Sequence, residues 1–285
     1  MKTEPFGPLD PALYREIVRR ALAEDLGWGD LTTEAAVPAD AQAHARIVAG
    51  VPCVVAGLDL AEETFRQLDP RARMTRHRHD GEACGSGTAV ATIEGRAAPL
   101  ATAERTALNF LSRLSATATA TRRFVDLSRG RVLVLDTRAT TPLLRTLEQY
   151  AVRAGGGTNH RQALDEGPLV ESKHVRLAGG VRPAFERVTR AVNDMPVEVE
   201  VRSLDELDEA LDAGVPRLLV TEVFGGDLAE AIRRTRGRAQ VEYSGAVTPG
   251  SFEAIVATGV DFVSIPALTA SPGAIDFRLE FELAG

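Results

Sequence analysis

The sequence predicts an α/β protein in two parts, an N-terminal α+β open sandwich followed by a series of β/α units around a parallel sheet. Three observations support this prediction. The chain has 285 residues, more than a single hydrophobic core usually organises. Up to residue 103, helical and strand patterns are mixed, which is typical of a sheet with helices on one face. Beyond that point, short apolar runs alternate regularly with amphipathic helical patterns, as in parallel β/α folds.

The N-terminal part is expected to contain helices and strands in mixed order. Their predicted ranges are 10–26 and 58–68 for the helices, and 45–55 and 88–94 for the strands. Asp10 and Pro11 mark the start of the first helix, because aspartate is a favoured N-cap and proline fits the first turn. This domain is placed at 1–103, and the C-terminal tail 275–285 is expected to pack on it.

The second part, placed at 104–274, is expected to begin in a long helix from about Thr102 to Asp126, where apolar residues recur at helical spacing. The strands predicted after it are 131–136, 168–170, 197–201, 218–221, 240–243 and 262–265. The helices predicted between them are 142–154, 183–192, 204–213, 227–236 and 249–258. This alternation fits either a parallel barrel or a doubly wound sheet.

Polar residues recur where the predicted strands end. They are Asp136 to Arg138, Glu200, Glu222, and Glu242 with Ser244. In a β/α barrel the carboxyl ends of the strands form the active-site face. The recurrence therefore favours a barrel over an open sheet and predicts an active site at that face.

Composition excludes several classes of protein. A hydrophobic content of 44% with 26% charged residues is that of a globular chain, and no apolar run reaches the eighteen or so residues that a membrane span needs. The first residues carry acids and prolines, unlike a secretory signal. The net charge of −7 argues against a nucleic-acid partner. We expect a cytoplasmic protein that binds neither membrane nor nucleic acid.

The two cysteines, Cys53 and Cys84, have no CxxC spacing and no neighbouring histidine. This pattern is typical of reduced structural thiols in a cytosolic protein, although the spacing alone leaves a disulfide open.

Cationic and imidazole residues gather at predicted strand or helix ends of the second part. They are Arg105, Arg138, His160, Arg161 and His174. Each alone is more often a surface ion pair or a hydrogen-bonded core histidine, and neither histidine has the partner spacing of a zinc site. Together, the planar guanidinium groups suit a ligand with two carboxylates. No metal ligand set is predicted.

Segments spread in order over nearly the whole chain carry one recurring pattern. They are 24–27, 29–33, 104–111, 135–138, 140–142, 150–157, 159–161, 198–200, 244–245 and 258–264. This pattern resembles the quinolinate phosphoribosyltransferase family. The resemblance implies a mixed N-terminal layer and an incomplete, TIM-like β/α barrel with fewer than eight strands.

The resemblance also implies a reaction and an assembly. Quinolinate and phosphoribosyl pyrophosphate would give nicotinate mononucleotide, pyrophosphate and carbon dioxide, with Mg²⁺. Arg105, Arg138, His160 and Arg161 would grip the two carboxylates of this small aromatic acid, and all four are present. The family implies a homodimer or higher homo-oligomer with a shared active site, to which the partner donates Arg105.

The phosphoribosyl half of the site departs from the family pattern. Ala139 and Glu171 stand where the family has lysines, and a new lysine, Lys173, lies two residues after the second. Ala246 and Pro266 replace glycines that let the backbone approach phosphate. A ligand with several negative charges needs cations around it, so these changes predict weaker binding of phosphoribosyl pyrophosphate.

These departures lead to a favoured hypothesis with two alternatives. The favoured hypothesis is decarboxylation of quinolinate, or of a similar pyridine dicarboxylate, to nicotinate without phosphoribosyl transfer. Lys173 or His174 would then act as general acid, with Glu200 and Glu222 as the remaining catalytic candidates, and no cofactor is expected. The alternatives are true transfer with Mg²⁺, using Lys173 or Arg176 as re-sited cations, and a non-catalytic protein that binds a pyridine carboxylate.

Overall fold

The computed structural model describes residues 6–192, 195–221 and 227–283. The chain forms two compact units. Among the described residues, the N-terminal unit comprises 6–122, 146–156 and 272–283, and the barrel unit comprises 123–145 and 157–271 with its gaps. The border after residue 122 lies inside the long helix, whereas the sequence places the border at 104. The fold class predicted from the sequence is confirmed.

The N-terminal unit is built on an antiparallel sheet with the strand order β12-β1-β5-β3. Its strands are β1 (Gln42–Ala49), β3 (Arg73–Arg76), β5 (Ala89–Arg96) and β12 (Phe277–Leu283), and a separate small pair joins β2 (Cys53–Val54) to β4 (Ala83–Cys84). Side chains of β1 alternate between exposed and buried, with Ala43, Ala45 and Ile47 inside. The C-terminal strand β12 pairs with β1 from Ala43 opposite Leu283 to Ala49 opposite Phe277.

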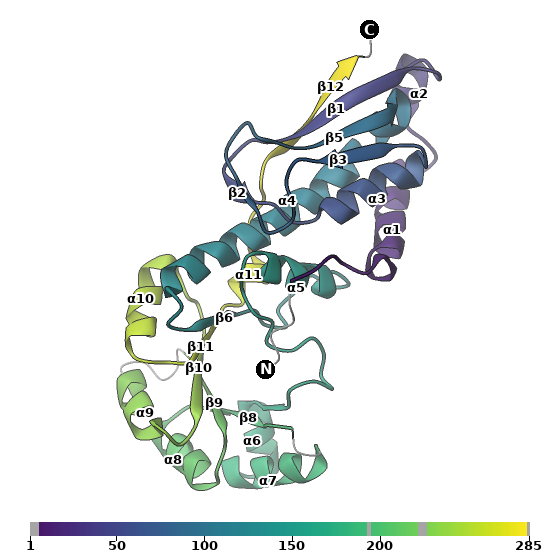
Figure 1. The fold of residues 1–285 in the computed structure, drawn as a ribbon. Coiled ribbons are helices and arrows are strands. Elements are labelled where there is room, and N and C mark those ends of the chain that lie inside the picture. Colours follow the sequence, from purple (N-terminus) through teal and green to yellow (C-terminus); the bar gives the residue numbers. More distant parts are fainter. Residues whose placement is uncertain (1–5, 193–194, 222–226, 284–285) are drawn as a thin grey trace. The chain divides into compact units, whose positions relative to one another are not determined.

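Helices cover one face of this sheet (Figure 1). They are α1 (Arg15–Leu26), α3 (Leu58–Leu68) and the first part of α4 (Ala97–Ser128), with the short η1 (Pro11–Leu13) and α2 (Leu31–Ala36) beside them. Leu58, Phe65 and Leu100 are fully buried between helices and sheet. Gly57 precedes α3 with φ of +105°, a conformation that an L side chain rarely adopts.

Helix α5 (Arg145–Ala154) belongs mostly to the N-terminal unit. Tyr150 on α5 donates a hydrogen bond to Asp80 at 2.7 Å, and Asp80 also accepts from the backbone N–H of Gly57 at 2.7 Å. Burial raises the pKa of this Asp80 carboxyl, although these hydrogen bonds oppose the shift. The contact joins α5 to the start of α3, two segments far apart in the sequence.

The barrel unit contains a parallel sheet with the order β6-β11-β10-β9-β8-β7. Its strands are β6 (Leu133–Leu135), β7 (Leu169–Val170), β8 (Glu198–Val201), β9 (Arg217–Thr221), β10 (Gln240–Ser244) and β11 (Phe262–Ser264). Every strand predicted from the sequence in this part is present, within a few residues at each end. Among the described residues β6 and β7 are the two edges of this sheet, so the barrel is incomplete.

Helices follow the strands of the barrel unit. They are α6 (Ser172–Ala178), α7 (Val181–Ala191), α8 (Leu204–Asp212), α9 (Leu228–Thr235), α10 (Pro249–Ala257) and α11 (Ala267–Ala270). Helices α7 to α10 match the predicted ranges. Helix α6 was not predicted, because its seven residues are too few to show an apolar repeat and Gly179 with Gly180 ends it at once.

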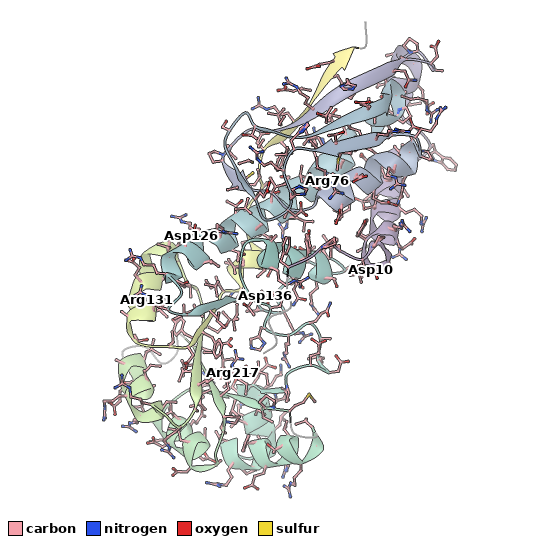
Figure 2. The ribbon with its side chains drawn as sticks, in the orientation of Figure 1. Asp10, Arg76, Asp126, Arg131, Asp136 and Arg217 are labelled. Carbon is pink, nitrogen blue, oxygen red and sulfur yellow. The ribbon has the colours of Figure 1, made fainter. Side chains whose placement is uncertain are left out.

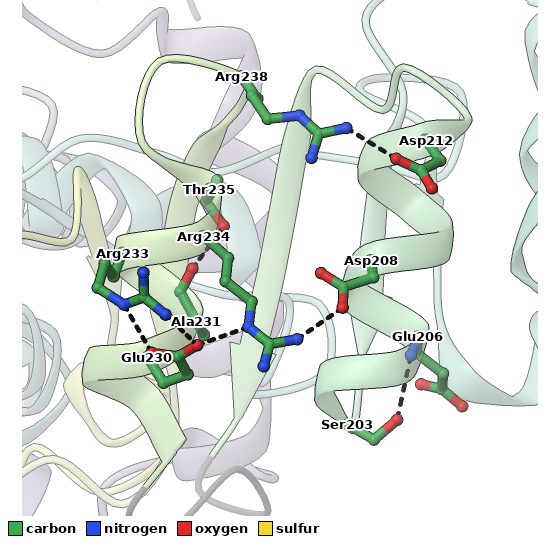
Figure 3. A network of polar contacts seen from close by, with 10 residues as sticks. All are labelled: Ser203, Glu206, Asp208, Asp212, Glu230, Ala231, Arg233, Arg234, Thr235 and Arg238. Atoms are coloured by element: carbon green, nitrogen blue, oxygen red, sulfur yellow. Dashed lines mark hydrogen bonds and ion pairs between the residues drawn. The ribbon is translucent and has the colours of Figure 1, made fainter.

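An ion-pair network joins α8 to α9 on the outside of the barrel unit (Figure 3). Arg234 contacts Glu230 at 2.7 Å and Asp208 at 2.6 Å, and Arg238 contacts Asp212 at 2.9 Å. These side chains are well exposed, so each pair contributes about 1 kcal/mol or less. The network aligns neighbouring helices and supplies little of the stability.

None of the described helices is both long enough and apolar enough to cross a membrane.

The core of the N-terminal unit supplies a first prediction. Phe65→Ala removes a fully buried ring and should lower the free energy of unfolding by about 3–5 kcal/mol. Arg234→Ala, which breaks only exposed ion pairs, should cost about 1 kcal/mol or less. Denaturant titration followed by circular dichroism measures both. Equal losses for the two variants would contradict this account of the core.

Candidate functional site

Two adjoining cavities open at the carboxyl ends of the barrel strands. The inner cavity has a volume of about 280 Å³, and the outer cavity, along β7, α6 and α7, has a volume of about 650 Å³. Arg138, Arg161, Leu169 and Glu171 line both. The site therefore lies at the face that the strand-end residues predicted, and entirely within the barrel unit.

The loop that carries His160 is fixed by Asp136, the residue directly after β6. Asp136 is fully buried; it accepts a hydrogen bond from the His160 backbone N–H at 2.8 Å and another from the Asn159 side chain. Thr158 adds a parallel bridge to Leu135 of β6. The glycines before it let the chain turn, since Gly156 has φ of +87°. These contacts deliver His160 and Arg161 to the inner cavity.

Below His160 lies a buried charge network that we call the barrel-floor network: His160, Glu198, Arg217 and Glu242. The Nε2 of His160 lies 3.0 Å from an oxygen of Glu198 and 3.4 Å from an oxygen of Glu242. Arg217 forms ion pairs with both carboxylates. Figure 2 shows Arg217 and Asp136 in the barrel unit. The four side chains alternate in charge and are almost completely buried.

The network changes the protonation of its members. Burial alone would lower the pKa of His160, but hydrogen bonds to Glu198 and Glu242 outweigh it and raise the pKa to about 10. Burial and the neighbouring Glu242 raise the pKa of Glu198. Burial also opposes ionisation of Glu242, yet hydrogen bonds from His160 and Ser264 and the charge of Arg217 hold its pKa below the ordinary value. His160 is therefore an imidazolium cation at neutral pH.

Arg217 is the member that the sequence analysis missed. It begins β9, directly opposite Glu198 of β8, and its guanidinium carbon lies 4.1 Å from the centre of the Phe262 ring. The period of two along each strand places these residues on the inner face of the sheet. In the sequence, an arginine at the start of a strand resembles a surface cation, and its contacts with Glu198 and Glu242 appear only in the fold.

Arg138 and Arg161 line the inner cavity together with His160. Among the described residues, no group accepts a hydrogen bond from the buried Nε of Arg138. Arg161 donates to the Gly167 carbonyl at 3.1 Å. Burial and the charge of Arg138 lower the pKa of Arg161. Two neighbouring guanidinium groups with an imidazolium below them form a place for carboxylates.

The residues proposed as catalytic are distributed around the outer cavity. Lys173 and His174 line it from the exposed first turn of α6. Lys173 contacts Glu171 at 2.6 Å, and Nδ1 of His174 accepts from the Glu171 backbone N–H at 3.0 Å. Glu200 accepts a hydrogen bond from the Ser172 backbone N–H at 2.7 Å and thus holds the start of α6.

Glu222 lies outside the described residues. Arg105 is exposed on α4 in the N-terminal unit, so the barrel unit alone does not contain it.

His160, Glu198 and Glu242 have the atom types of a metal site and lie within 4.8 Å of one another. Arg217 already supplies the cation between the two carboxylates. A divalent ion would add charge to a group that is balanced without it.

The positions that depart from the family pattern mostly face the site. Ala139 and Pro266 line the inner cavity, and Glu171 lines both cavities. The Ala139 carbonyl accepts from the Thr269 hydroxyl at 2.7 Å, and Pro266 opens α11. Ala246 is exposed. The inner cavity therefore holds its positive charge at Arg138, Arg161 and His160.

Comparison with known proteins matches both units to one family. The N-terminal domain of quinolinate phosphoribosyl transferase matches residues 30–115, and its C-terminal domain matches residues 117–280. The chain belongs to the quinolinate phosphoribosyltransferase family.

Bacterial relatives match this chain over nearly its whole length. A nicotinate-nucleotide pyrophosphorylase [carboxylating] of Mycobacterium leprae is 39% identical over 93% of this chain and 96% of its own length. A probable nicotinate-nucleotide pyrophosphorylase of Bacillus subtilis is 34% identical over 95% of this chain and 94% of its own. The solved nicotinate-nucleotide pyrophosphorylase of Francisella tularensis superposes with a TM-score of 0.93 at 35% identity, covering 99% of this chain and all of that one.

The barrel-floor network supplies a second prediction. Arg217→Met leaves two buried carboxylates with one cation, His160, in place of two, and should lower the free energy of unfolding by about 3–5 kcal/mol. Adding Glu242→Gln to this variant should recover part of the loss, because one of the uncompensated charges is then gone. Denaturant unfolding of the wild type, both single variants and the double variant forms the cycle. Strictly additive losses would contradict the network.

The raised pKa of His160 predicts how stability depends on pH. A group that binds its proton more tightly when folded stabilises the fold fully below its unfolded pKa, near 6.5, and loses this contribution as pH rises through its folded pKa of about 10. The difference in unfolding free energy between the wild type and His160→Gln should thus be largest at pH 6 and shrink steadily toward pH 10. A difference that grows with pH would contradict the assignment.

Proposed function

We propose that this family member transfers phosphoribose from phosphoribosyl pyrophosphate to quinolinate or a similar pyridine dicarboxylate. The products would be the pyridine mononucleotide, pyrophosphate and carbon dioxide. The observation that carries the proposal is the inner cavity, where Arg138, Arg161 and the His160 imidazolium converge at the carboxyl ends of the strands. Relatives that match the whole chain are named as carboxylating or decarboxylating enzymes of this reaction.

The chemistry of the cavity supports an anionic aromatic substrate. Carboxylates gain charge-assisted hydrogen bonds from guanidinium groups, and the buried position strengthens them. Glu198 and Glu242 raise the pKa of His160 and so keep its ring protonated at neutral pH. Substrate binding therefore does not require His160 to take up a proton from water. A cation fixed beside the carboxylate carbon that is lost also stabilises negative charge developing on the ring.

The second substrate would occupy the side of the inner cavity lined by hydroxyl groups. Thr137, Ser244 and Ser264 line that side and offer donors to ribose or phosphate oxygens. Mg²⁺ bound to the pyrophosphate would neutralise charge that Ala139 and Glu171 leave unmatched. We propose Glu200 on β8, whose carboxylate accepts a hydrogen bond from the Ser172 backbone N–H, as a ligand of this ion.

We also propose that the active site includes a residue from a second copy of the chain. Arg105 is exposed on α4, and a homodimer would bring it to the cavity of its partner. Arg105→Ala mixed with an Arg138→Ala variant then offers a test of sharing, because heterodimers regain one intact site while each variant alone has none.

The assay that tests the function incubates the full chain with quinolinate, with and without phosphoribosyl pyrophosphate and Mg²⁺, and follows nicotinate mononucleotide and nicotinate. We expect mononucleotide only when both are present. Arg138→Ala should lower kcat/KM at least about a hundredfold, because it removes a buried guanidinium from the substrate carboxylate. Arg233→Ala, an exposed arginine on α9, is the matched control and should leave kcat/KM unchanged.

Decarboxylation without transfer remains the second candidate. Ala139 and Glu171, which line the inner cavity where the family pattern has lysines, favour it because they lower the positive charge available to phosphates. Formation of nicotinate without phosphoribosyl pyrophosphate would support this candidate against transfer. Tight binding of quinolinate with neither product would support a non-catalytic binder.

A further inference from the structure

We propose that the outer cavity holds an apolar substituent of the aromatic acid, so that the preferred substrate is a pyridine dicarboxylate enlarged by an alkyl group or a fused ring. This inference rests on the proposed function, since it concerns the acid that binds at Arg138 and Arg161.

The outer cavity has an apolar wall beside a charged rim, and the rim consists of Arg138, Arg161, Glu171, Lys173, His174 and Arg187. The apolar residues of the wall are Leu164, Pro168, Leu169, Val170, Ala178, Ala184 and Val188. Glu171 and Lys173 on its rim neutralise each other at 2.6 Å. The exposed Arg187 can cover apolar surface with its stem while its charge stays in water. An uncharged apolar group gains binding free energy when it is buried against these apolar residues.

The volume exceeds what an unsubstituted ring fills. At about 650 Å³ the outer cavity lies in the range of about 300–1,000 Å³ that holds a drug-sized ligand, whereas quinolinate has only about a dozen heavy atoms. Alanines at 178 and 184 keep this space open, where longer aliphatic side chains would fill it.

The two cavities are continuous through the residues that would hold the carboxylates. Arg138 and Arg161 line both, so an acid bound by these two side chains lies where it can extend into either cavity. Among the described strands, β7 pairs only with β8. The outer cavity lies along β7, at the edge where the barrel is incomplete, and gives the substituent room beyond the sheet.

The test compares quinolinate with quinoline-2,3-dicarboxylate and with quinolinates carrying a 5-methyl, 5-ethyl or 5-butyl group. Binding of each acid is measured by calorimetry, and kcat/KM is measured with phosphoribosyl pyrophosphate and Mg²⁺. We expect the best enlarged acid to exceed quinolinate by about tenfold or more in both, because each buried methylene favours binding.

Variants that fill the outer cavity sharpen the test. Ala178→Leu and Val188→Phe should lower binding and kcat/KM of the enlarged acids about tenfold while leaving quinolinate within about twofold. Leu177→Phe, an exposed neighbour on α6, is the matched control and should change neither. Circular dichroism and the melting temperature establish that each variant is folded.

The outcomes separate this inference from the proposed function. Quinolinate as the best acid, with filling variants that affect all acids equally, would overturn the enlarged substrate and leave transfer intact. Mononucleotide formation from none of the acids, with enlarged acids bound more tightly than quinolinate, would overturn transfer and support the cavity assignment.

Discussion

The ion pairing of His160 with Glu198 and Glu242, completed by Arg217, is the interaction on which the site depends. It buries two carboxylates and two cations inside the barrel, an arrangement that is costly unless every charge is paired. As a result of this pairing, the His160 imidazolium is held in a fixed position below the inner cavity. Because the carboxylates favour the protonated ring, His160 is an imidazolium at neutral pH, with its charge balanced inside the network.

Other elements of the barrel unit position the members of this network. Strands β8, β9 and β10 each contribute one member of the network from the inner face of the sheet. Asp136 ties the His160 loop to the end of β6, and the hydroxyl of Ser264 on β11 supports Glu242. Arg138 and Arg161 then add two further cations above. We propose that this pocket selects carboxylates and that the outer cavity limits which carboxylic acids fit.

Much of this was predictable from sequence because it follows local patterns. The strand periods and the alternation with helices predicted the parallel sheet, and glycines before His160 predicted a loop that approaches a ligand. Arg217 was not predicted, because its partner Glu242 is distant in sequence and an inward arginine at the start of a strand looks like any surface cation. Helix α6 was missed because it is short, and its first turn carries Lys173 and His174, which line the outer cavity. The structure also shows an ion pair between Glu171 and Lys173 that the sequence did not predict.

The protonation of His160 is the most direct test of the central claim. Nitrogen NMR of ¹⁵N-labelled histidine follows each ring through a pH titration, and His160→Gln identifies the resonance. The account predicts an imidazolium that persists above neutral pH and titrates near pH 10, and a lower pKa when Glu242→Gln removes one carboxylate. A His160 ring that is neutral at pH 8, with a pKa close to 6.5 that Glu242→Gln does not change, would contradict it.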